Sequence, residues 1–179
     1  MGHSGWMDTE VTIRDEQADE ADVVDELVGE AFGGRPNEVG LVRGLRATRE
    51  PVISRVAVQD GQVVGHAMLS RLRLEGSEAR LLGLAPVSVA ARCQGRGVGG
   101  QLTKDALQVA EEAGAAIVVV LGDPGFYGRL GFRLASQHGI EPPMGVPPRA
   151  FMIVCLSAYD NSYAGRVVYP PVFIDTGTL

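Results

Sequence analysis

A glycine-rich segment, Gln94-Gly95-Arg96-Gly97-Val98-Gly99-Gly100, has the composition of a phosphate-binding loop. A strand-like apolar run at 81–89 leads into it, and a helix-like run leaves it. Glycines let the backbone approach a ligand, and several N–H groups can then converge on an anion beside the positive end of the following helix. One exposed contact of this kind contributes about 0.3 to 1 kcal/mol, so a pyrophosphate needs several amides acting together. We therefore expect this loop to bind phosphate through its main chain.

The glycines match two ligand-binding patterns, and the first is that of a dinucleotide site. Gly95, Gly97 and Gly100 satisfy G-x-G-x-x-G, and Asp123, after the next apolar strand, could serve as the ribose-binding acid. In a dinucleotide fold, however, the glycines follow the first strand and several more parallel strands come after them. Here about ninety residues precede the loop and about eighty follow it. A nicotinamide-dependent oxidoreductase is therefore only the third hypothesis.

The second pattern is Gln-x-x-Gly-x-Gly, carried by Gln94, Gly97 and Gly99. It resembles the acyl-CoA loop of the GNAT superfamily of N-acyltransferases. The resemblance extends upstream to the strand end at 87–89. Downstream it reaches the segment from Tyr127 to Phe132, which is similar to the family's Tyr-x-x-x-Gly-Phe. The order and spacing of these motifs agree with the family, and the coarse pattern agrees over residues 10–157.

This resemblance implies transfer of an acetyl group from acetyl-CoA to an amine, by direct attack within a ternary complex. Backbone N–H groups near Val87 and Val89 would bind the pantetheine arm and polarise the thioester, and Tyr127 would protonate the departing CoA thiolate. A competing role for Tyr127 is packing or a hydrogen bond to the CoA sulfur. The pyrophosphate would be held by the loop that Gln94 braces, through the amides of Gly95, Arg96, Gly97, Val98, Gly99 and Gly100.

The resemblance leaves two matters open. A non-catalytic acyl-CoA sensor or interaction module on the same fold would keep the loop important but make Tyr127 dispensable. No motif assigns the general base that must take the proton of an alkyl amine. Asp123 is favoured by its position, although the sequence Gly122-Asp123-Pro124-Gly125 is also typical of an ordinary turn. His66 lies among apolar neighbours and is more typical of a packed core histidine. The candidates are Glu75, Glu78, Asp123, His66 and Glu30.

Hydrophobic periodicity predicts the elements that must hold these residues. Apolar residues at helical spacing indicate helices that carry Val24 to Phe32, Val39 to Leu45 and Val98 to Ala113, with a short one at 126–130. Asp60-Gly61 is a hairpin signal, so the strands on either side of it should be antiparallel. Pro86 cannot donate to a ladder and belongs at a bulge or an unpaired edge. Strands are expected at 11–14, 55–58, 62–74, 79–89, 117–121, 132–135 and 151–157.

The resulting fold class is α/β (α+β) of the GNAT type. It has a mixed, mostly antiparallel twisted sheet of six to seven strands flanked by about four helices, with one central parallel βαβ unit. In the family, the strand before the loop splays from its parallel neighbour, and the pantetheine arm lies in the gap. We expect a single domain over 9–179 behind a flexible leader at 1–8. The tail at 160–179 should be an edge strand or an extended arm.

Net charge and hydropathy limit the classes of partner that the protein can have. The 16 Lys and Arg residues against 22 Asp and Glu residues give a net charge of −6, which disfavours nucleic acid. The longest apolar run, 115–121, is too short for a membrane span, and no signal peptide is evident. Cys93 and Cys155 have no disulfide or metal spacing and suit a reducing compartment, so a cytoplasmic enzyme without a metal is expected. The amine acceptor, a small molecule or a protein, and a homodimeric state are left open.

Overall fold

The computed structural model describes residues 10–50 and 52–179. The leader expected at 1–8 lies outside these residues. Within them, the protein has no helix of the length and apolarity needed to cross a membrane. The elements follow the predicted order closely, and the boundaries of the predicted strands move by at most two residues.

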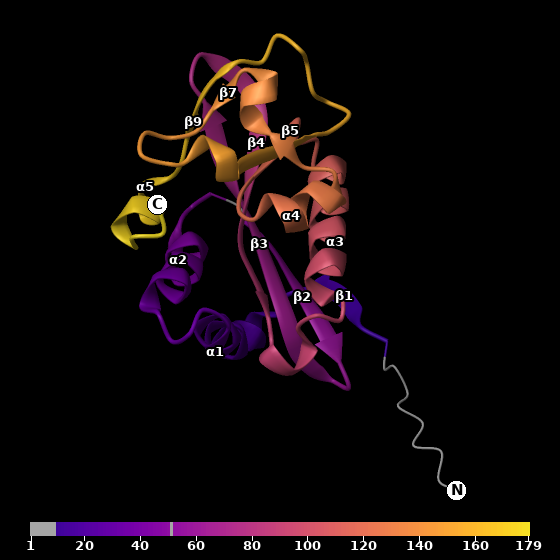
Figure 1. The fold of residues 1–179 in the computed structure, drawn as a ribbon. Coiled ribbons are helices and arrows are strands. Elements are labelled where there is room, and N and C mark those ends of the chain that lie inside the picture. Colours follow the sequence, from indigo (N-terminus) through magenta and orange to yellow (C-terminus); the bar gives the residue numbers. More distant parts are fainter. Residues whose placement is uncertain (1–9, 51) are drawn as a thin grey trace, which may run out of the picture.

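A long, strongly bent sheet forms the centre of the molecule (Figure 1). Its strand order is β1-β2-β3-β4-β5-β8-β6, and along this path only the β4–β5 pair is parallel among the described strands. The Asp60-Gly61 turn joins β2 to β3 in the predicted antiparallel hairpin. The strands are β1 (Thr12–Asp15), β2 (Ile53–Gln59), β3 (Gln62–Leu74), β4 (Ser77–Val89), β5 (Ile117–Leu121), β6 (Arg133–Leu134), β7 (Ile140–Glu141), β8 (Phe151–Cys155) and β9 (Gly165–Val168).

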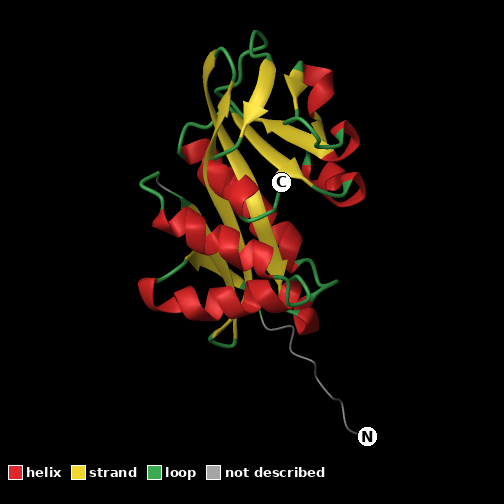
Figure 2. Cartoon of the chain, turned by 90° about the vertical axis from the view of Figure 1, so that its left-hand side faces the viewer, coloured by secondary structure: helices red, strands yellow, loops and turns green. Residues whose placement is uncertain are grey.

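Helices cover both faces of this sheet. α1 (Ala21–Ala31) and α2 (Pro36–Ala47) bury Val24, Val28 and Leu41 against one face, which Figure 2 shows from the helix side. α3 (Val98–Glu112) buries Leu102 and Ala106 against the other face. β4, α3 and β5 form the expected βαβ unit, and the short α4 (Pro124–Tyr127) follows β5. The mixed, mostly antiparallel fold predicted from the sequence is therefore confirmed.

β4 and β5 part at the middle of the sheet. Their parallel ladder runs from the Leu81–Ile117 pair to the Gly83–Val119 pair and then ends. On its other side β4 remains paired with β3, but the register jumps between Leu84 and Val87. Pro86 lies within this bulge, as the sequence predicts. From Leu84 to Val89, one edge of β4 is therefore not paired with a described strand, and this is the expected splay.

The C-terminal tail contains more structure than the sequence predicts. Residues 165–168 form β9, which pairs with the end of β3 and with β7, so the edge-strand alternative is correct for this part. The following segment is a helix, α5 (Pro171–Asp175), where an extended arm was the other alternative. Five residues are too few for a helical period to be read, and Pro171 satisfies the first helical position without an N–H group. β7 and β9 raise the strand count above the predicted six to seven.

α5 packs closely on α2 because two glycines of α2 face it. A Cβ atom at Gly40 would lie 3.3 Å from Thr176 Cγ2, and one at Gly44 would overlap with the side chain of Val172. Asn37 at the start of α2 adds a hydrogen bond of 3.0 Å to the carbonyl oxygen of Gly177. Each helix glycine costs about 1 kcal/mol relative to alanine. The close contact between the helices offsets that cost.

We predict that Gly44→Ala lowers the free energy of unfolding by about 1 to 3 kcal/mol, because the stiff side chain of Val172 cannot yield to the new methyl group. The matched control is Gly29→Ala in α1, where the added Cβ would make an ordinary contact of 3.5 Å with Val39. That variant should gain up to about 1 kcal/mol from helix propensity. Urea unfolding measures both, and equal effects of the two substitutions would contradict this packing account.

Candidate functional site

The glycine-rich loop lies between the end of β4 and the start of α3. Gly95 and Gly97 have φ values of 72° and 84°, in the left-handed region that favours glycine. Gly97 is the residue that caps α3, and it provides no side chain to bind the first amides of the helix. Those amides have no intrahelical carbonyl partner and carry the positive end of the helix dipole. Gln94 ties the loop to β4 by donating a hydrogen bond of 3.0 Å to the carbonyl oxygen of Val89.

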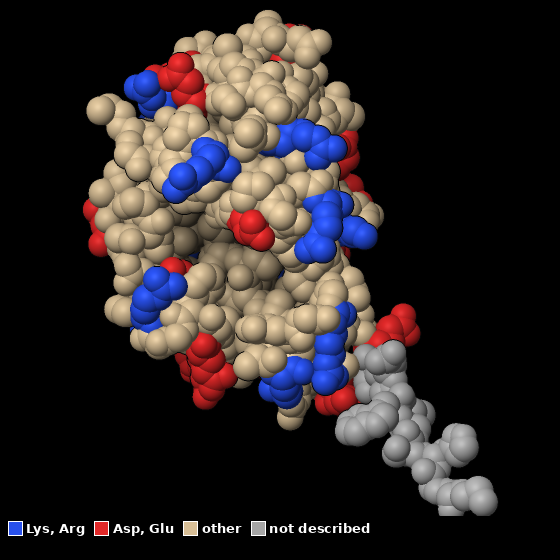
Figure 3. Space-filling model, in the orientation of Figure 1, with Lys and Arg blue, Asp and Glu red and all other residues tan. Residues whose placement is uncertain are grey.

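A groove of about 730 Å³ runs from this loop along the open edge of β4. It is lined by Val87, Ser88 and Val89 from β4, by Gly95 and Gly97 to Gly100 from the loop, and by Tyr127. Figure 3 shows a hollow on this face of the molecule, with mostly neutral residues inside it and both basic and acidic residues around it. The groove therefore combines an uncapped helix terminus with an unpaired strand edge. Such a site suits a long ligand that carries phosphate at one end and amide groups along its arm.

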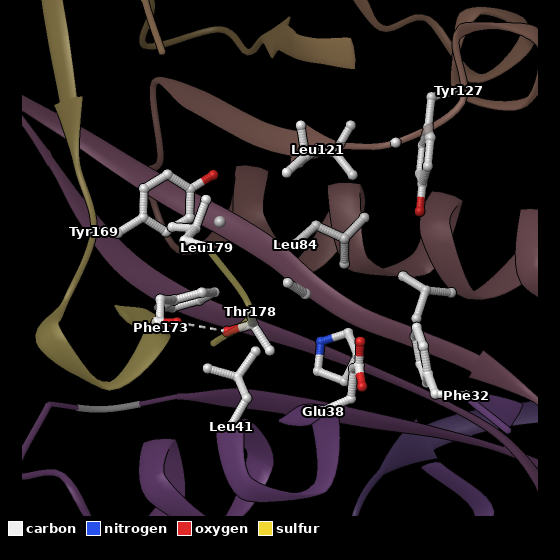
Figure 4. A pocket seen from close by; sticks show the side chains of 16 residues that line it. Phe32, Glu38, Leu41, Leu84, Leu121, Tyr127, Tyr169, Phe173, Thr178 and Leu179 are labelled. Atoms are coloured by element: carbon white, nitrogen blue, oxygen red, sulfur yellow. Dashed lines mark hydrogen bonds between the residues drawn. The ribbon is translucent and has the colours of Figure 1, made fainter. Parts of the chain in front are cut away.

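A second, apolar cavity of about 300 Å³ lies on the other side of Tyr127. Its walls come from the parted strands, at Leu84 to Val87 and Val120 to Gly122, and from α2 and the C-terminal segment. Figure 4 shows Leu84, Leu121, Phe173 and Leu179 around it. Phe32, Val87 and Tyr127 line both cavities. Two compartments thus meet beside one phenol group.

Tyr127 is held at this junction by ring packing. Its ring makes edge contacts with Phe126 at 4.8 Å and with Phe132 at 5.4 Å between ring centroids. Gly122 leaves the space for it, since a Cβ atom there would overlap the ring. Burial raises the pKa of Tyr127 from 10 to about 12. The phenol therefore keeps its proton at neutral pH and can donate it, or a hydrogen bond, to a group in either cavity.

None of the five base candidates lines either cavity. Asp123 is exposed and accepts a hydrogen bond from the Gly125 amide, which is the turn role weighed for it. Glu75 and Glu78 lie at the β3–β4 hairpin, at the opposite end of β4 from the groove, and Glu30 is exposed on α1. The sequence reasoning missed a further carboxylate, Glu38 of α2, which does line the apolar cavity. Only the packing of α2 beside the parted strands brings it there.

His66 is a core residue, as the sequence reasoning favoured. It is fully buried on β3, and its Nε2 atom lies 2.8 Å from Ser54 Oγ. Ser54 in turn contacts Glu16, and Arg46 bridges Glu16 and Asp25. Burial and the positive charge of Arg46 lower the pKa of His66 to about 3. It is therefore neutral at physiological pH.

The loop residues predicted from the sequence are mostly found together. Val87, Val89, Gln94, Gly95, Gly97, Val98, Gly99, Gly100 and Tyr127 all line the groove. Arg96 is exposed and does not line it, whereas Arg129 does. Arg129 was not singled out because it lies inside the Tyr-x-x-x-Gly-Phe pattern at a position where that pattern specifies no residue type. Its guanidinium group adds positive charge beside the loop.

Comparison with known proteins points to one family. A model described as "Acetyltransferase (GNAT) domain" matches residues 12–135. Escherichia coli YhbS, described as an uncharacterized N-acetyltransferase, is 36% identical over 130 residues, which cover 72% of this chain and 77% of that protein. Escherichia coli YjhQ, also described as an uncharacterized N-acetyltransferase, is 31% identical over 159 residues, which cover 83% of this chain and 87% of that protein.

Two solved structures agree with this chain over most of its length. The crystal structure of E. coli YhbS in complex with CoA matches with a TM-score of 0.87 and 31% identity, over 96% of both chains. The structure of a GNAT family acetyltransferase from Brucella melitensis in complex with acetyl-CoA matches with a TM-score of 0.77 and 31% identity. That match covers 92% of this chain and 99% of the other.

We predict that Gly97→Ala weakens CoA binding by about 5- to 30-fold, because alanine resists the left-handed conformation by about 1 to 2 kcal/mol and the loop amides then turn away from the ligand. Gly76→Ala, in the β3–β4 hairpin at φ 71°, carries the same backbone strain outside the groove. It should lose stability but keep its affinity for CoA. Isothermal titration with CoA measures the difference, and a similar loss of affinity in both variants would assign the effect to general destabilisation.

We also predict that stability falls as the pH is lowered from 6.5 toward 3, with His66 contributing about 1.4 kcal/mol per pH unit. In this window the unfolded chain binds a proton on His66 that the folded protein excludes, because burial lowers the pKa of the folded state. Replacing this residue, His66→Gln, should flatten the slope. Chemical unfolding at pH 4, 5 and 6 provides the measurement, and identical slopes for wild type and variant would refute the assignment.

Proposed function

Because the chain belongs to the GNAT acetyltransferase family, we propose that it transfers the acetyl group of acetyl-CoA to an amine by direct attack, with both substrates bound in the two cavities that meet at Tyr127. The relatives named above are N-acetyltransferases, and two of the matched structures hold CoA or acetyl-CoA. The meeting of the two cavities carries the proposal. Groups held in the two compartments would come close to each other beside the shared residues Phe32, Val87 and Tyr127.

The groove suits the donor. The space above Gly95 and Gly97 is free of other atoms within 4 Å of where a Cβ would stand, so a pyrophosphate can approach the loop amides directly. The N-terminus of α3 and Arg129 supply positive potential there. Along the edge of β4 from Leu84 to Val89, the unpaired main chain can bind the amides of a pantetheine arm as an added strand would. The acetyl group then lies toward Tyr127.

Direct attack requires the amine and the thioester to be held in line, and it forms no covalent intermediate on the protein. The nitrogen lone pair of a neutral amine attacks the thioester carbon, a C–N bond forms, and the C–S bond breaks with its electron pair leaving on sulfur. Holding the reactants in adjacent compartments makes this step effectively unimolecular, an effect that can supply about 7 to 11 kcal/mol. In our proposal, the shared wall of Phe32, Val87 and Tyr127 marks the place where the bond forms.

Tyr127 is assigned to the departing sulfur. A phenol with a pKa of about 12 is a weaker acid than a thiol of about 8.5, so full proton transfer is uphill by about 5 kcal/mol. That cost is small against the barrier of about 16 kcal/mol that a turnover of about 10 per second implies. Tyr127 therefore donates a hydrogen bond as negative charge develops on sulfur, and its proton follows. This account joins the two roles that the sequence left as alternatives for this residue.

The other two hypotheses fare differently. A nicotinamide-dependent oxidoreductase is not supported, because the relatives are acetyltransferases and the loop follows the fourth strand of a sheet that pairs β4 and β5 alone in parallel along its main path. A non-catalytic acyl-CoA module would use the same groove. Such a module would not require a protonated phenol between the two cavities. A substitution of Tyr127 therefore distinguishes a non-catalytic module from an enzyme.

We predict that Tyr127→Phe lowers kcat by about 100-fold or more, which is the usual contribution of a positioned general acid. Its Kd for acetyl-CoA should remain within about twofold of wild type, since the glycine loop and β4 are unchanged. Thiol release from acetyl-CoA with a panel of amines gives the rate. Tyr163→Phe, a tyrosine outside both cavities, serves as the control and should behave as wild type. An unchanged kcat in Tyr127→Phe would remove this residue from the mechanism.

A further inference from the structure

The cavity on the acceptor side of Tyr127 is apolar with one acidic exception. Leu84, Leu121 and Phe173 contribute hydrocarbon to its walls, and Glu38 is the only charged side chain among the described residues that line it. Figure 4 shows the Tyr127 hydroxyl directed into this space from one side, while Glu38 lines it from α2 on the opposite side. A proton donor and a proton acceptor therefore face one small compartment.

Glu38 lacks the partners that a glutamate at its position usually has. It is the third residue of α2, where a glutamate commonly bonds back to the residue that caps the helix. Here the amide of that residue, Arg35, bonds to the carbonyl oxygen of Phe32 instead. Within residues 10–50 and 52–179, Glu38 forms no ion pair, and its Oε2 atom is buried without a hydrogen-bond partner. By contrast Asp25, the buried acid of the neighbouring helix, is paired with both Arg43 and Arg46.

An unpaired buried carboxylate oxygen is costly, since it has given up water without gaining a protein donor. A cationic group placed in the cavity would offset that cost. An uncharged donor would supply a hydrogen bond without compensating the negative charge, and an anionic ligand would supply neither. The charge of the site thus favours a ligand that carries an ammonium group.

We propose that the acceptor is a compact, largely apolar primary amine and that Glu38 binds its ammonium group and takes its first proton. This inference rests on the proposed acetyl transfer. The volume of about 300 Å³ is at the lower end of the range usual for small-molecule sites, about 300 to 1,000 Å³, and this favours a compact ligand. An aromatic or branched aliphatic body of that size fills the space between Leu84, Leu121 and Phe173. Extended polyamines and sugars would place polar groups against these walls.

The proton balance is complete with residues already assigned. Glu38 removes one proton from R–NH₃⁺ and passes it to solvent, which frees the nitrogen lone pair. That nitrogen forms the C–N bond as the C–S bond breaks, and the sulfur leaves with its electron pair and takes the proton of Tyr127. The nitrogen gives up its second proton, which restores the phenol. The products are the N-acetyl amine, CoA with its thiol protonated, and one proton in solvent.

The test measures amine binding directly and does not depend on turnover. The protein is saturated with CoA and titrated calorimetrically with 2-phenylethylamine, with its uncharged analogue 2-phenylethanol and with spermidine. We expect 2-phenylethylamine to bind most tightly. Glu38→Gln should weaken it by about 10- to 100-fold, the usual effect of losing a hydrogen bond to a charged group. Glu30→Gln, an exposed glutamate of α1 outside both cavities, is the matched control and should bind as wild type does.

A second variant guards against a folding defect in the first. Leu121 is 41% exposed and lines the cavity, so Leu121→Lys should fold and introduce a cation that repels the amine. It should weaken 2-phenylethylamine at least as much as Glu38→Gln does, while leaving 2-phenylethanol less affected. Thermal unfolding of each variant verifies that it is folded.

The inference is overturned if wild type does not bind 2-phenylethylamine, if 2-phenylethanol or spermidine binds as tightly, or if Glu38→Gln keeps the wild-type affinity. These results are separable from failure of the proposed function. Failure of the function would show as absence of CoA binding, or as absence of thiol release from acetyl-CoA with any amine. A protein that acetylates polar amines with Glu38→Gln unaffected would retain the function and lose only this assignment.

Discussion

The parting of β4 from β5 after Gly83 is the feature on which the rest of the site depends. A strand edge inside a protein carries main-chain donors and acceptors that must find partners. Here the bulge at Pro86 and the end of the ladder leave that edge open between two helical layers. The groove beside the glycine-rich loop and the apolar cavity both open from this gap. A fully paired sheet would have neither, because the strands would satisfy each other.

Glycine does three different things around this gap. At Gly95 and Gly97 it permits the left-handed backbone that turns the loop amides outward. At Gly122 it makes room for the ring of Tyr127, which brings the phenol to the junction of the cavities. At Gly40 and Gly44 it lets α5 approach α2, so that the C-terminal segment can line the apolar cavity. The conformation of the loop, the position of the Tyr127 ring and the packing of α5 on α2 thus all depend on the absence of a Cβ atom in glycine.

A buried charged cluster and a single glutamate show how the partners of an acidic residue decide its role. Around His66, the charges of Glu16, Asp25 and Arg46 compensate one another, and the network holds α1, α2 and the sheet together. At Glu38 the compensation is missing. A sequence shows the same residue types in both places. Only the hydrogen-bond and ion-pair partners in the folded protein distinguish an acidic side chain with a structural role from one that is available to a ligand.

The sequence by itself determined the order of the predicted elements, the Asp60-Gly61 hairpin, the bulge at Pro86 and the position of the glycine-rich loop between strand and helix, because local backbone preferences and short motifs act over a few residues. It also placed Tyr127 in a recognisable pattern. The tertiary structure alone decided which carboxylate lines the apolar cavity, since Glu38 and the sheet gap lie about fifty residues apart along the chain. It alone decided that Tyr169, Phe173 and Leu179 form a wall of the apolar cavity. Such contacts depend on the packing of distant helices, for which one sequence contains no local signal.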